Sequence, residues 1–492
     1  MQGRIAVLVY GPWEPDKGRF ATGTSARVVN AIPTATGWGP MPSLVEISEA
    51  LPSECKGAIA VRSSSGAYTI YAFTASKAYR LDSSDYSWDD VTRLVGGDYS
   101  LPDGDRWSLA VFGSYLVATN IADAVQYIDI DSGTNFAALP GSPPQAKYAW
   151  VAGEHLVLGH LASFPNTIHV SALGDAGYWT VGQRFSDIQT FPDGEEVMGG
   201  IGSERGAIVF QRKMIRQMTM GAFGQDGRFS FSTAVINPNR GVIAPYSIVQ
   251  VGPGMAAYLS SDGFCLGIEG KPIGGERIDR TFFDNADADT IALTKGIVDP
   301  YKHIIWWQVT VGSGKALLGY HWQLDRWCFA DNDVTEMVDL ATPAITIDGL
   351  DLLYATIDDV TPSFDSRLFS GGLPAFAAFT TDNKLGYFTG TNKAASFDTW
   401  EMPLAQGRRA FLQEVRPVLD ATTYTVKVAA SDRHSGTVPA FGTAVSPNTS
   451  TGICHFRSSG LLHALRLEIA AAQEWSHVHG LDDVMARAEG RR

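Results

Sequence analysis

A repeated unit of a turn followed by an apolar strand is the feature that most constrains the fold of this chain. Short polar or glycine-containing turns lie near residues 66, 113, 153, 205, 254, 302 and 349. Each turn precedes a burst of apolar and β-branched residues, at 67–73, 115–118, 155–158, 207–210, 255–259, 303–307 and 350–354. The spacing of roughly 40–50 residues matches one four-stranded propeller blade. The sequence therefore predicts an all-β fold with a β-propeller of seven blades.

The composition agrees with many short strands joined by turns. The chain has 492 residues, of which 45% are hydrophobic and 18% charged, an ordinary globular composition that is long enough for two or three domains. It contains 51 Gly and 24 Pro and has no long amphipathic helical pattern. We therefore expect β-rich domains rather than a helical or disordered chain.

Changes in this rhythm predict three segments. Residues 1–60 are proline-rich and are expected to form an extended lead-in, in which 42–51 could be a strand or a helical turn. Residues 61–394 are expected to form the propeller. Residues 395–492 are expected to form a C-terminal β-sandwich-like platform with an exposed tail from 485. Its strands are expected at 410–419, 424–429, 452–457, 461–469 and 474–478.

Aromatic residues recur near the end of each unit. They are Trp88, Phe136, Trp179, Phe229 and Trp327. An aromatic ring near the outer end of a blade fills the widening wedge between neighbouring blades. We therefore expect these side chains to pack rather than to bind a ligand.

The charge balance limits the possible partners. The formal net charge of −14 argues against a general nucleic-acid clamp, which would be basic, but it is compatible with a channel through which DNA slides. No apolar stretch approaches membrane-spanning length, and the N-terminal segment lacks a small-residue cleavage site. We therefore expect the protein to be made and folded in a cytoplasm.

The cysteines give no sign of a disulfide framework. Cys55, Cys265, Cys328 and Cys454 are widely scattered, and no Cys-x-x-Cys pair occurs. They are expected to be free, buried thiols.

Three segments were weighed as metal sites. His477 and His479 lie on one face of a strand, with His463 or Asp482 as a third ligand. Residues 284–289 and 129–133 resemble acidic cation loops but lack the glycine and terminal glutamate of a full calcium loop. Solvated strand ends and plain acidic turns explain them better, so no metal or cofactor is expected.

No catalytic constellation emerges from the sequence. Residues 83–88 resemble one defective copy of the Asp-box of sialidase-like propellers, and 63–66 lack a nucleophile elbow. The adjacent acids at 89–90, 195–196 and 482–483 point to opposite sides of an extended strand, which makes them poor acid–base pairs. We therefore expect no catalytic residues and no enzymatic activity.

Basic residues cluster in three places, at Arg212, Lys213 and Arg216, at Arg408 and Arg409, and at Arg491 and Arg492. The first cluster could contact passing nucleic acid or an acidic neighbouring subunit in a channel. The alternative is a solvated strand edge protected by charge.

Short motifs across most of the chain resemble the tail nozzle, or tail tube hub, proteins of short-tailed bacteriophages. In the propeller region they lie at 106–120, 139–147, 157–159, 171–179, 206–212, 261–264 and 298–302. In the C-terminal region they lie at 457–460, 465–469, 475–477 and 480. The family pattern Arg-x-x-Gly-Arg-Tyr-His-x-x-Arg is changed here, since Leu461 and Leu462 replace the Arg-Tyr pair while His463 and Arg466 are kept.

The resemblance implies a propeller with a platform domain in a homohexameric ring of the virion tail. Such a ring extends the DNA channel, helps to retain packaged genomic double-stranded DNA and conducts it during ejection. Its implied partners are further copies of the chain, the head-to-tail adaptor under the portal, and a tail fibre or tail-tip plug.

We expect the platform to carry an adaptor-facing or inter-subunit surface with Arg408, Arg409, Arg457 and Trp475. Cyclic, head-to-tail contacts are the expected geometry. The alternative is a carbohydrate-binding or carbohydrate-active propeller. A cellular protein-interaction propeller is disfavoured, because Trp-Asp and kelch-type signatures are absent from the sequence.

Overall fold

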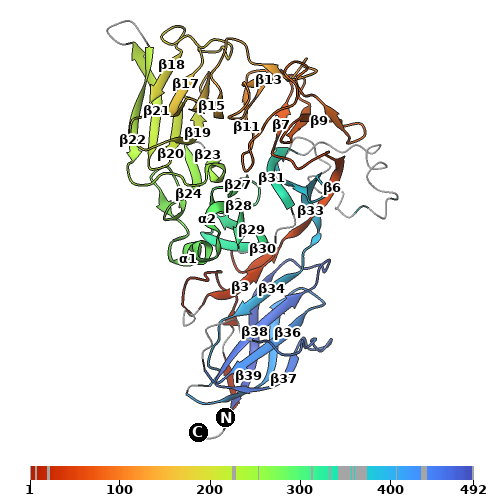
Figure 1. Ribbon diagram of the computed structural model, residues 1–492. Coiled ribbons are helices and arrows are strands. Elements are labelled where there is room, and N and C mark those ends of the chain that lie inside the picture. The colour runs from red at the N-terminus through yellow and green to blue at the C-terminus, as the bar shows by residue number, and fades with distance from the viewer. Residues whose placement is uncertain are drawn as a thin grey trace.

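The computed structural model shows a propeller above a β-sandwich, with both chain ends at the far end of the sandwich (Figure 1). The structure describes residues 2–5, 8–18, 23–223, 229–252, 254–311, 314–331, 334–341, 356, 360, 374–405, 407–433 and 440–489. Helices are few among them, namely α1 (Gly275–Asn285), α2 (Ala288–Ile291) and the 3-10 turn η1 (Pro245–Ser247).

Seven four-stranded antiparallel sheets in the described residues are the propeller blades. Blade 1 consists of β7 (Gly57–Arg62), β8 (Tyr68–Phe73), β9 (Ala78–Leu81) and β10 (Trp88–Asp90). Blade 2 consists of β11 (Ser108–Phe112), β12 (Tyr115–Thr119), β13 (Gln126–Asp129) and β14 (Ala137–Ala138). Blade 3 consists of β15 (Ala146–Ala152), β16 (His155–Leu161), β17 (Phe164–Val170) and β18 (Asp187–Thr190). Blade 4 consists of β19 (Val197–Ser203), β20 (Gly206–Gln211), β21 (Ile215–Phe223) and β22 (Phe229–Asn237). Blade 5 consists of β23 (Val249–Gly252), β24 (Met255–Ser260), β25 (Gly263–Leu266) and β26 (Lys271–Pro272). Blade 6 consists of β27 (Lys295–Asp299), β28 (Ile304–Val311), β29 (Gly314–His321) and β30 (Arg326–Asp331). Blade 7 is β31 (Val334–Ala341), β32 (Pro374–Thr380), β33 (Lys384–Asn392) and β6 (Pro42–Ala50).

The first strand of each blade lies nearest the axis. β11 contacts both β7 and β15, and β27 contacts both β23 and β31, as expected of strands arranged around a common centre. Six of the seven apolar bursts coincide with the second strands β8, β12, β16, β20, β24 and β28, so the repeat marks the hairpin between first and second strands. The seventh burst, at 350–354, lies outside the described residues, and the second strand of blade 7 is instead β32.

Blade 7 joins distant parts of the chain. Its outer strand β6 pairs antiparallel with β33, with Val45 opposite Tyr387, and Ile47 is 1% exposed in the core. Residues 42–50 are therefore a strand, which settles the choice left open by the sequence. Because the N-terminal strand completes the last blade, closing the ring of blades depends on a contact across more than 300 residues of chain.

The second domain is a sandwich of two sheets built from both chain ends. One sheet holds β37 (Cys454–Gly460), β35 (Ala410–Leu419), β39 (Val478–Ala488), β5 (Trp38–Pro40) and β4 (Ala31–Pro33), with β1 (Gln2–Ile5) and β2 (Leu8–Val9) also on β39. The other holds β3 (Ser25–Val29), β34 (Ala395–Thr399), β38 (Leu462–Ile469) and β36 (Thr425–Ser431).

The N-terminal 60 residues differ from the expected separate lead-in. They supply β1 to β5 to the sandwich and β6 to the propeller. Tyr10 and Trp38 enter the sandwich core, where their rings lie 5.4 and 6.4 Å from the Phe397 ring. The C-terminal tail also differs, because residues up to Ala488 continue β39 and Ala486 is buried.

The aromatic residues expected between blades pack as the wedge argument requires. Phe136 lies against Tyr71 and Phe73 of blade 1, and Trp327 of blade 6 lies 5.3 Å from Phe264 of blade 5. Trp88 packs on Phe379 of blade 7. The side chain of Phe229 lies outside the described residues. These rings join neighbouring blades into one body.

Candidate functional site

A buried charged triad closes one part of the propeller axis. Arg106, just before the inner strand of blade 2, donates from Nε to both carboxylate oxygens of Glu336 at 3.1 and 3.0 Å. Lys295, the first residue of blade 6, also binds Glu336, which belongs to blade 7. Burial alone would raise the pKa of Glu336, but the Arg106 and Lys295 charges hold it below its ordinary value. The triad therefore links three blades through one ionised carboxylate.

A cavity of about 390 Å³ lies beside this triad, where the inner strands of several blades begin. Its polar lining is Asp103, Asp105, Lys147, Tyr148, His160, Glu196, Arg212 and Tyr246. Its apolar wall is Met198, Ile243, Pro245, Ala292 and Leu293. We call this space the axial cavity. Its size is in the range of small-molecule sites, which run from roughly 300 to 1,000 Å³.

Four of the five charged side chains in the axial cavity are already paired, and the fifth, Asp103, is exposed. Lys147 Nζ lies 2.6 Å from Asp105 Oδ1, and Arg212 Nε donates to Glu196 Oε1 at 2.7 Å. The Tyr246 hydroxyl donates to Asp105 at 3.3 Å and accepts the Arg106 backbone N–H at 2.9 Å. These bonds fix the polar groups in place before any ligand arrives.

His160 reaches the axial cavity through a local distortion of β16. The strand register shifts between Gly159 and Leu161, and His160 has a φ of 55°, a left-handed conformation that is uncommon for a residue with a side chain. Its Nδ1 lies 3.0 Å from the Val197 carbonyl, so Nδ1 carries the hydrogen and Nε2 is an acceptor in the neutral ring. Burial lowers the pKa of His160, which favours that neutral form.

The basic cluster expected to contact DNA or a neighbour is neutralised within blade 4. Arg212 binds Glu196, and Lys213 binds Glu195. Arg216 is buried, binds Asp193 and Gln211, and stacks on Phe191. Arg212 faces the axial cavity. These three cations thus face three carboxylates and present little unbalanced positive charge.

The adjacent acids weighed for catalysis serve in the same kind of ion pair. Asp89 binds Arg80, and Asp90 binds Lys77, on neighbouring strands of blade 1. The Asp483 side chain lies outside the described residues. Within the described part of the chain, these acids stabilise strand edges rather than converge on a reaction centre.

The segments weighed as metal sites serve local structure. His477 lies 3.3 Å from Asp420, His479 binds the Thr36 carbonyl, and His463 is fully buried on β38. Asp287 caps α2 by accepting the Asp289 N–H. Among the described residues, no group of three or more His, Cys, Asp or Glu side chains is placed to hold a metal ion. All four cysteines are free and buried.

The expected platform surface is only partly available to a partner. Arg408, Arg409 and Arg457 are exposed, and Arg409 binds Asp432 and the Ser459 carbonyl. Trp475 is 6% exposed and packs edge-on against Phe397 in the sandwich core. Its place in the expected interface is therefore corrected: the ring supports the sandwich from inside and cannot reach a partner.

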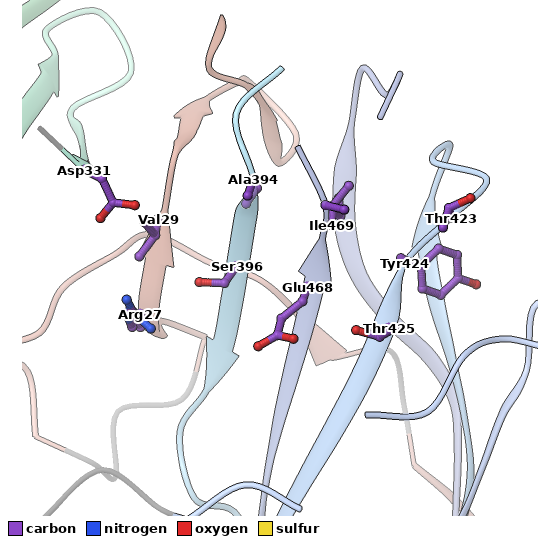
Figure 2. Close-up of a pocket in the computed structure, with 12 residues that line it drawn as sticks. Arg27, Val29, Asp331, Ala394, Ser396, Thr423, Tyr424, Thr425, Glu468 and Ile469 are labelled. Carbon is purple, nitrogen blue, oxygen red and sulfur yellow. The ribbon is translucent and has the colours of Figure 1, made fainter. Parts of the chain in front are cut away.

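A shallow cleft of about 410 Å³ crosses the four-stranded sheet of the sandwich. Figure 2 shows side chains from successive strands in it, with Ser396 and Glu468 side by side and Thr425 beyond them. Asp331, at the end of blade 6, lies at one end of the cleft, and Arg27 lies farther along β3, beyond Val29 (Figure 2). Glu468 is paired with Lys427 at 2.7 Å. The cleft therefore combines a few paired polar groups with a larger apolar lining.

A surface loop between blades 1 and 2 displays the two most exposed large apolar side chains in the described part of the chain. Leu94 is 82% and Val95 is 88% exposed. We call these two residues the apolar knob. The sequence pattern that could have indicated it is an aliphatic pair directly before Gly96-Gly97, which is typical of a turn with an apolar tip.

The loop that carries the apolar knob is held rigid from below. The Arg93 guanidinium donates to the carbonyls of Gly96, Gly97 and Asp98 at 3.3, 2.9 and 3.0 Å. It also donates to Asp123 at 2.9 Å in a pair whose side chains are 13% and 9% exposed. A mostly buried ion pair therefore holds in place a loop whose tip lies in solvent.

Comparisons with known proteins add little to this picture. No protein-family model and no curated protein matches the chain. Among solved structures, the chain is similar to the crystal structure of BamB from Moraxella catarrhalis, with 12% identity over 73% of this chain and 92% of that chain and a TM-score of 0.37. A similarity this low carries no functional argument, and the β-propeller assignment rests on the strand order described above. No helix in the described residues is long and apolar enough to cross a membrane.

Proposed function

We propose that this chain is a structural subunit of a ring in the tail of a short-tailed phage particle, where it extends the DNA channel. The observation that carries the proposal is the apolar knob. Two aliphatic side chains on a braced loop cost free energy in water, roughly 25 cal/mol per Å² of apolar surface, unless another protein covers them. Because Arg93 already holds the loop in one conformation, a contact with another protein would cost less conformational entropy.

The DNA path of this proposal lies between subunits and not along the axis of one propeller, where the Arg106–Glu336–Lys295 triad links blades 2, 6 and 7. The channel of this proposal is therefore the hole of a ring of subunits. The net charge of −14 suits a wall that DNA passes without sticking, because each phosphate–cation contact adds salt-sensitive affinity.

The ring is proposed to assemble head to tail, with the knob of one subunit against the next. A contact between two different surfaces closes a ring when the rotation permits. The six-fold number, the adaptor and portal above, the fibre or plug below, and the virion location come from the sequence resemblance alone.

Single-particle imaging of the purified full-length protein, with light scattering after gel filtration, tests this function. Wild type should form cyclic rings with an axial hole. The double variant Leu94→Ser/Val95→Ser should be a monomer that keeps the wild-type circular dichroism spectrum and a cooperative unfolding transition, although it loses the stabilisation that assembly gives the wild type. The matched control is Phe164→Ser on blade 3, which removes another side chain that is 62% exposed and should leave the rings intact. A wild-type monomer at all concentrations, or rings unaffected by the double variant, would contradict the proposal.

A further inference from the structure

We propose that the axial cavity is a binding site for a neutral sugar of one or two rings. This site is independent of ring assembly, because the cavity lies within one chain and the apolar knob takes no part in its lining.

The paired charges select against a charged ligand. Asp105 is bound to Lys147, and Glu196 is bound to Arg212, at 2.6 and 2.7 Å. An anion would have to displace a carboxylate from its cation, and a cation between the paired groups would have to displace Lys147 or Arg212, because the remaining carboxylate, Asp103, is exposed to solvent. A hydroxyl can instead donate to a carboxylate oxygen while accepting from the neighbouring cation, since a carboxylate accepts several hydrogen bonds.

Aromatic ring edges form part of the cavity wall. Tyr148 lies edge-on to His160 at 5.9 Å and to Tyr246 at 6.4 Å. Lys147 and Arg106 lie over the Tyr148 and Tyr246 rings, so a sugar would pack against ring edges rather than stack on a face. Pro245 and Leu293 extend this wall with apolar atoms. A cavity with an apolar wall and a few fixed polar groups is the usual form of a small-molecule site.

His160 adds a fixed acceptor. Its Nδ1–H is bound to the Val197 carbonyl, which orients Nε2 as the acceptor for a ligand hydroxyl. The left-handed backbone at this position costs free energy, and such strain is concentrated at functional sites. The distortion places an imidazole in the cavity where a regular strand would not.

The test is saturation-transfer NMR and calorimetry on the full-length protein with maltose, cellobiose, lactose and N,N′-diacetylchitobiose. Glucuronate and glucosamine serve as charged probes, and glycerol as a small polyol without a ring. At least one neutral sugar should bind, and the charged probes should bind at least tenfold more weakly. Binding should stay constant from pH 7 to pH 8, since His160 is neutral there.

The decisive variant is His160→Gly, which suits a φ of 55° and removes the imidazole without backbone strain. It should lower sugar affinity by about tenfold or more, the loss expected for one buried hydrogen bond to a fixed partner. The matched control is His303→Gly, another histidine with a φ of 56°, in the β27–β28 turn, which should leave affinity unchanged. Glu196→Gln should also weaken binding.

Three outcomes would overturn the proposal. They are the absence of saturation transfer for every neutral sugar, tighter binding of a charged probe than of its neutral counterpart, and equal affinities for wild type and His160→Gly. Loss of sugar binding with intact rings would leave the structural function untouched.

Discussion

Asn30 and Asp331 bind each other twice at the junction between the two domains. The Asn30 side chain donates to Asp331 Oδ2 at 3.0 Å, and the Asp331 backbone N–H donates to Asn30 Oδ1 at 2.9 Å. Asn30 also donates to the Ala394 carbonyl at 2.8 Å, so one buried amide joins the turn between β3 and β4 of the sandwich to blade 6 and to the connection between β33 and β34. Its φ of 56° is a conformation that Asn tolerates better than most residues.

Asn30→Ala should lower the free energy of unfolding by about 2–4 kcal/mol, because it loses three hydrogen bonds and places a Cβ residue in a left-handed conformation. Asn30→Gly loses the same bonds without the backbone strain, so it should cost less. Urea unfolding gives both values, and small-angle scattering should show a wider domain angle in both variants. Equal stability of wild type and Asn30→Ala would show that the junction is not held by this amide.

The buried triad predicts a second large effect. Glu336→Gln leaves the Arg106 and Lys295 charges buried together without a partner, which should cost about 3–5 kcal/mol. The control is Asp89→Asn in the Arg80 pair, whose side chains are 35% and 46% exposed, where the cost should be below about 1 kcal/mol.

The same triad should contribute to acid unfolding. The pKa of Glu336 is lower in the folded chain than in the unfolded chain, so its stabilisation is present above the unfolded pKa and is lost as the pH falls through the folded pKa. Glu336→Gln should therefore flatten the loss of stability in acid. A variant with the same acid profile as wild type would contradict this role.

Local sequence patterns predicted six of the propeller blades. They did not predict that β6 completes the seventh, because that depends on a contact between segments far apart in the chain. Six bursts became second strands because a glycine or polar turn and the strand after it are encoded within about ten residues of sequence. The seventh blade depends on β6, whose partner β33 lies more than 300 residues away, and no local pattern in 42–50 names that partner.

The site was harder to predict than the fold for the same reason. Arg106 and Glu336 are 230 positions apart, and neither lies in a recognisable motif. His160 becomes a cavity residue only because β16 bulges, and a lone histidine within an apolar strand gives no sign of that. Arg212, Lys213 and Arg216 looked like a free basic cluster because their acidic partners lie together on another segment, residues 193–196 just before β19.

The role of β6 in the propeller core gives a further prediction. Ile47 is 1% exposed among residues of blades 1 and 7, so Ile47→Ala should cost about 2–5 kcal/mol through lost burial and the cavity left behind. Phe164→Ala is the control, since that side chain is 62% exposed and its loss should change stability by less than about 0.5 kcal/mol. Chemical denaturation of both variants checks this, and a cost below 1 kcal/mol for Ile47→Ala would mean that 42–50 is a dispensable lead-in.

Asp279 on α1 carries a prediction about pH. Its Oδ1 accepts the Phe264 N–H at 3.2 Å, while Oδ2 is buried without a hydrogen-bond partner. A Cβ at Gly263 or Gly274 would lie 2.0 or 1.7 Å from its carboxylate, so only glycine admits the side chain at this close approach.

Burial, with smaller effects from Asp16 and Asp262, raises the pKa of Asp279 from 3.8 to about 7. Between those two values the folded chain holds a proton that the unfolded chain has released, so stability should fall as the pH rises through this window. The slope from one such group is at most about 1.4 kcal/mol per pH unit. Asp279→Asn cannot ionise, so urea unfolding from pH 4 to pH 8 should show a flatter profile and greater stability than wild type at pH 8. The exposed turn residue Asp382 provides the control, since Asp382→Asn should keep the wild-type slope. If Asp279→Asn kept that slope as well, the buried carboxyl would not be the group that sets it.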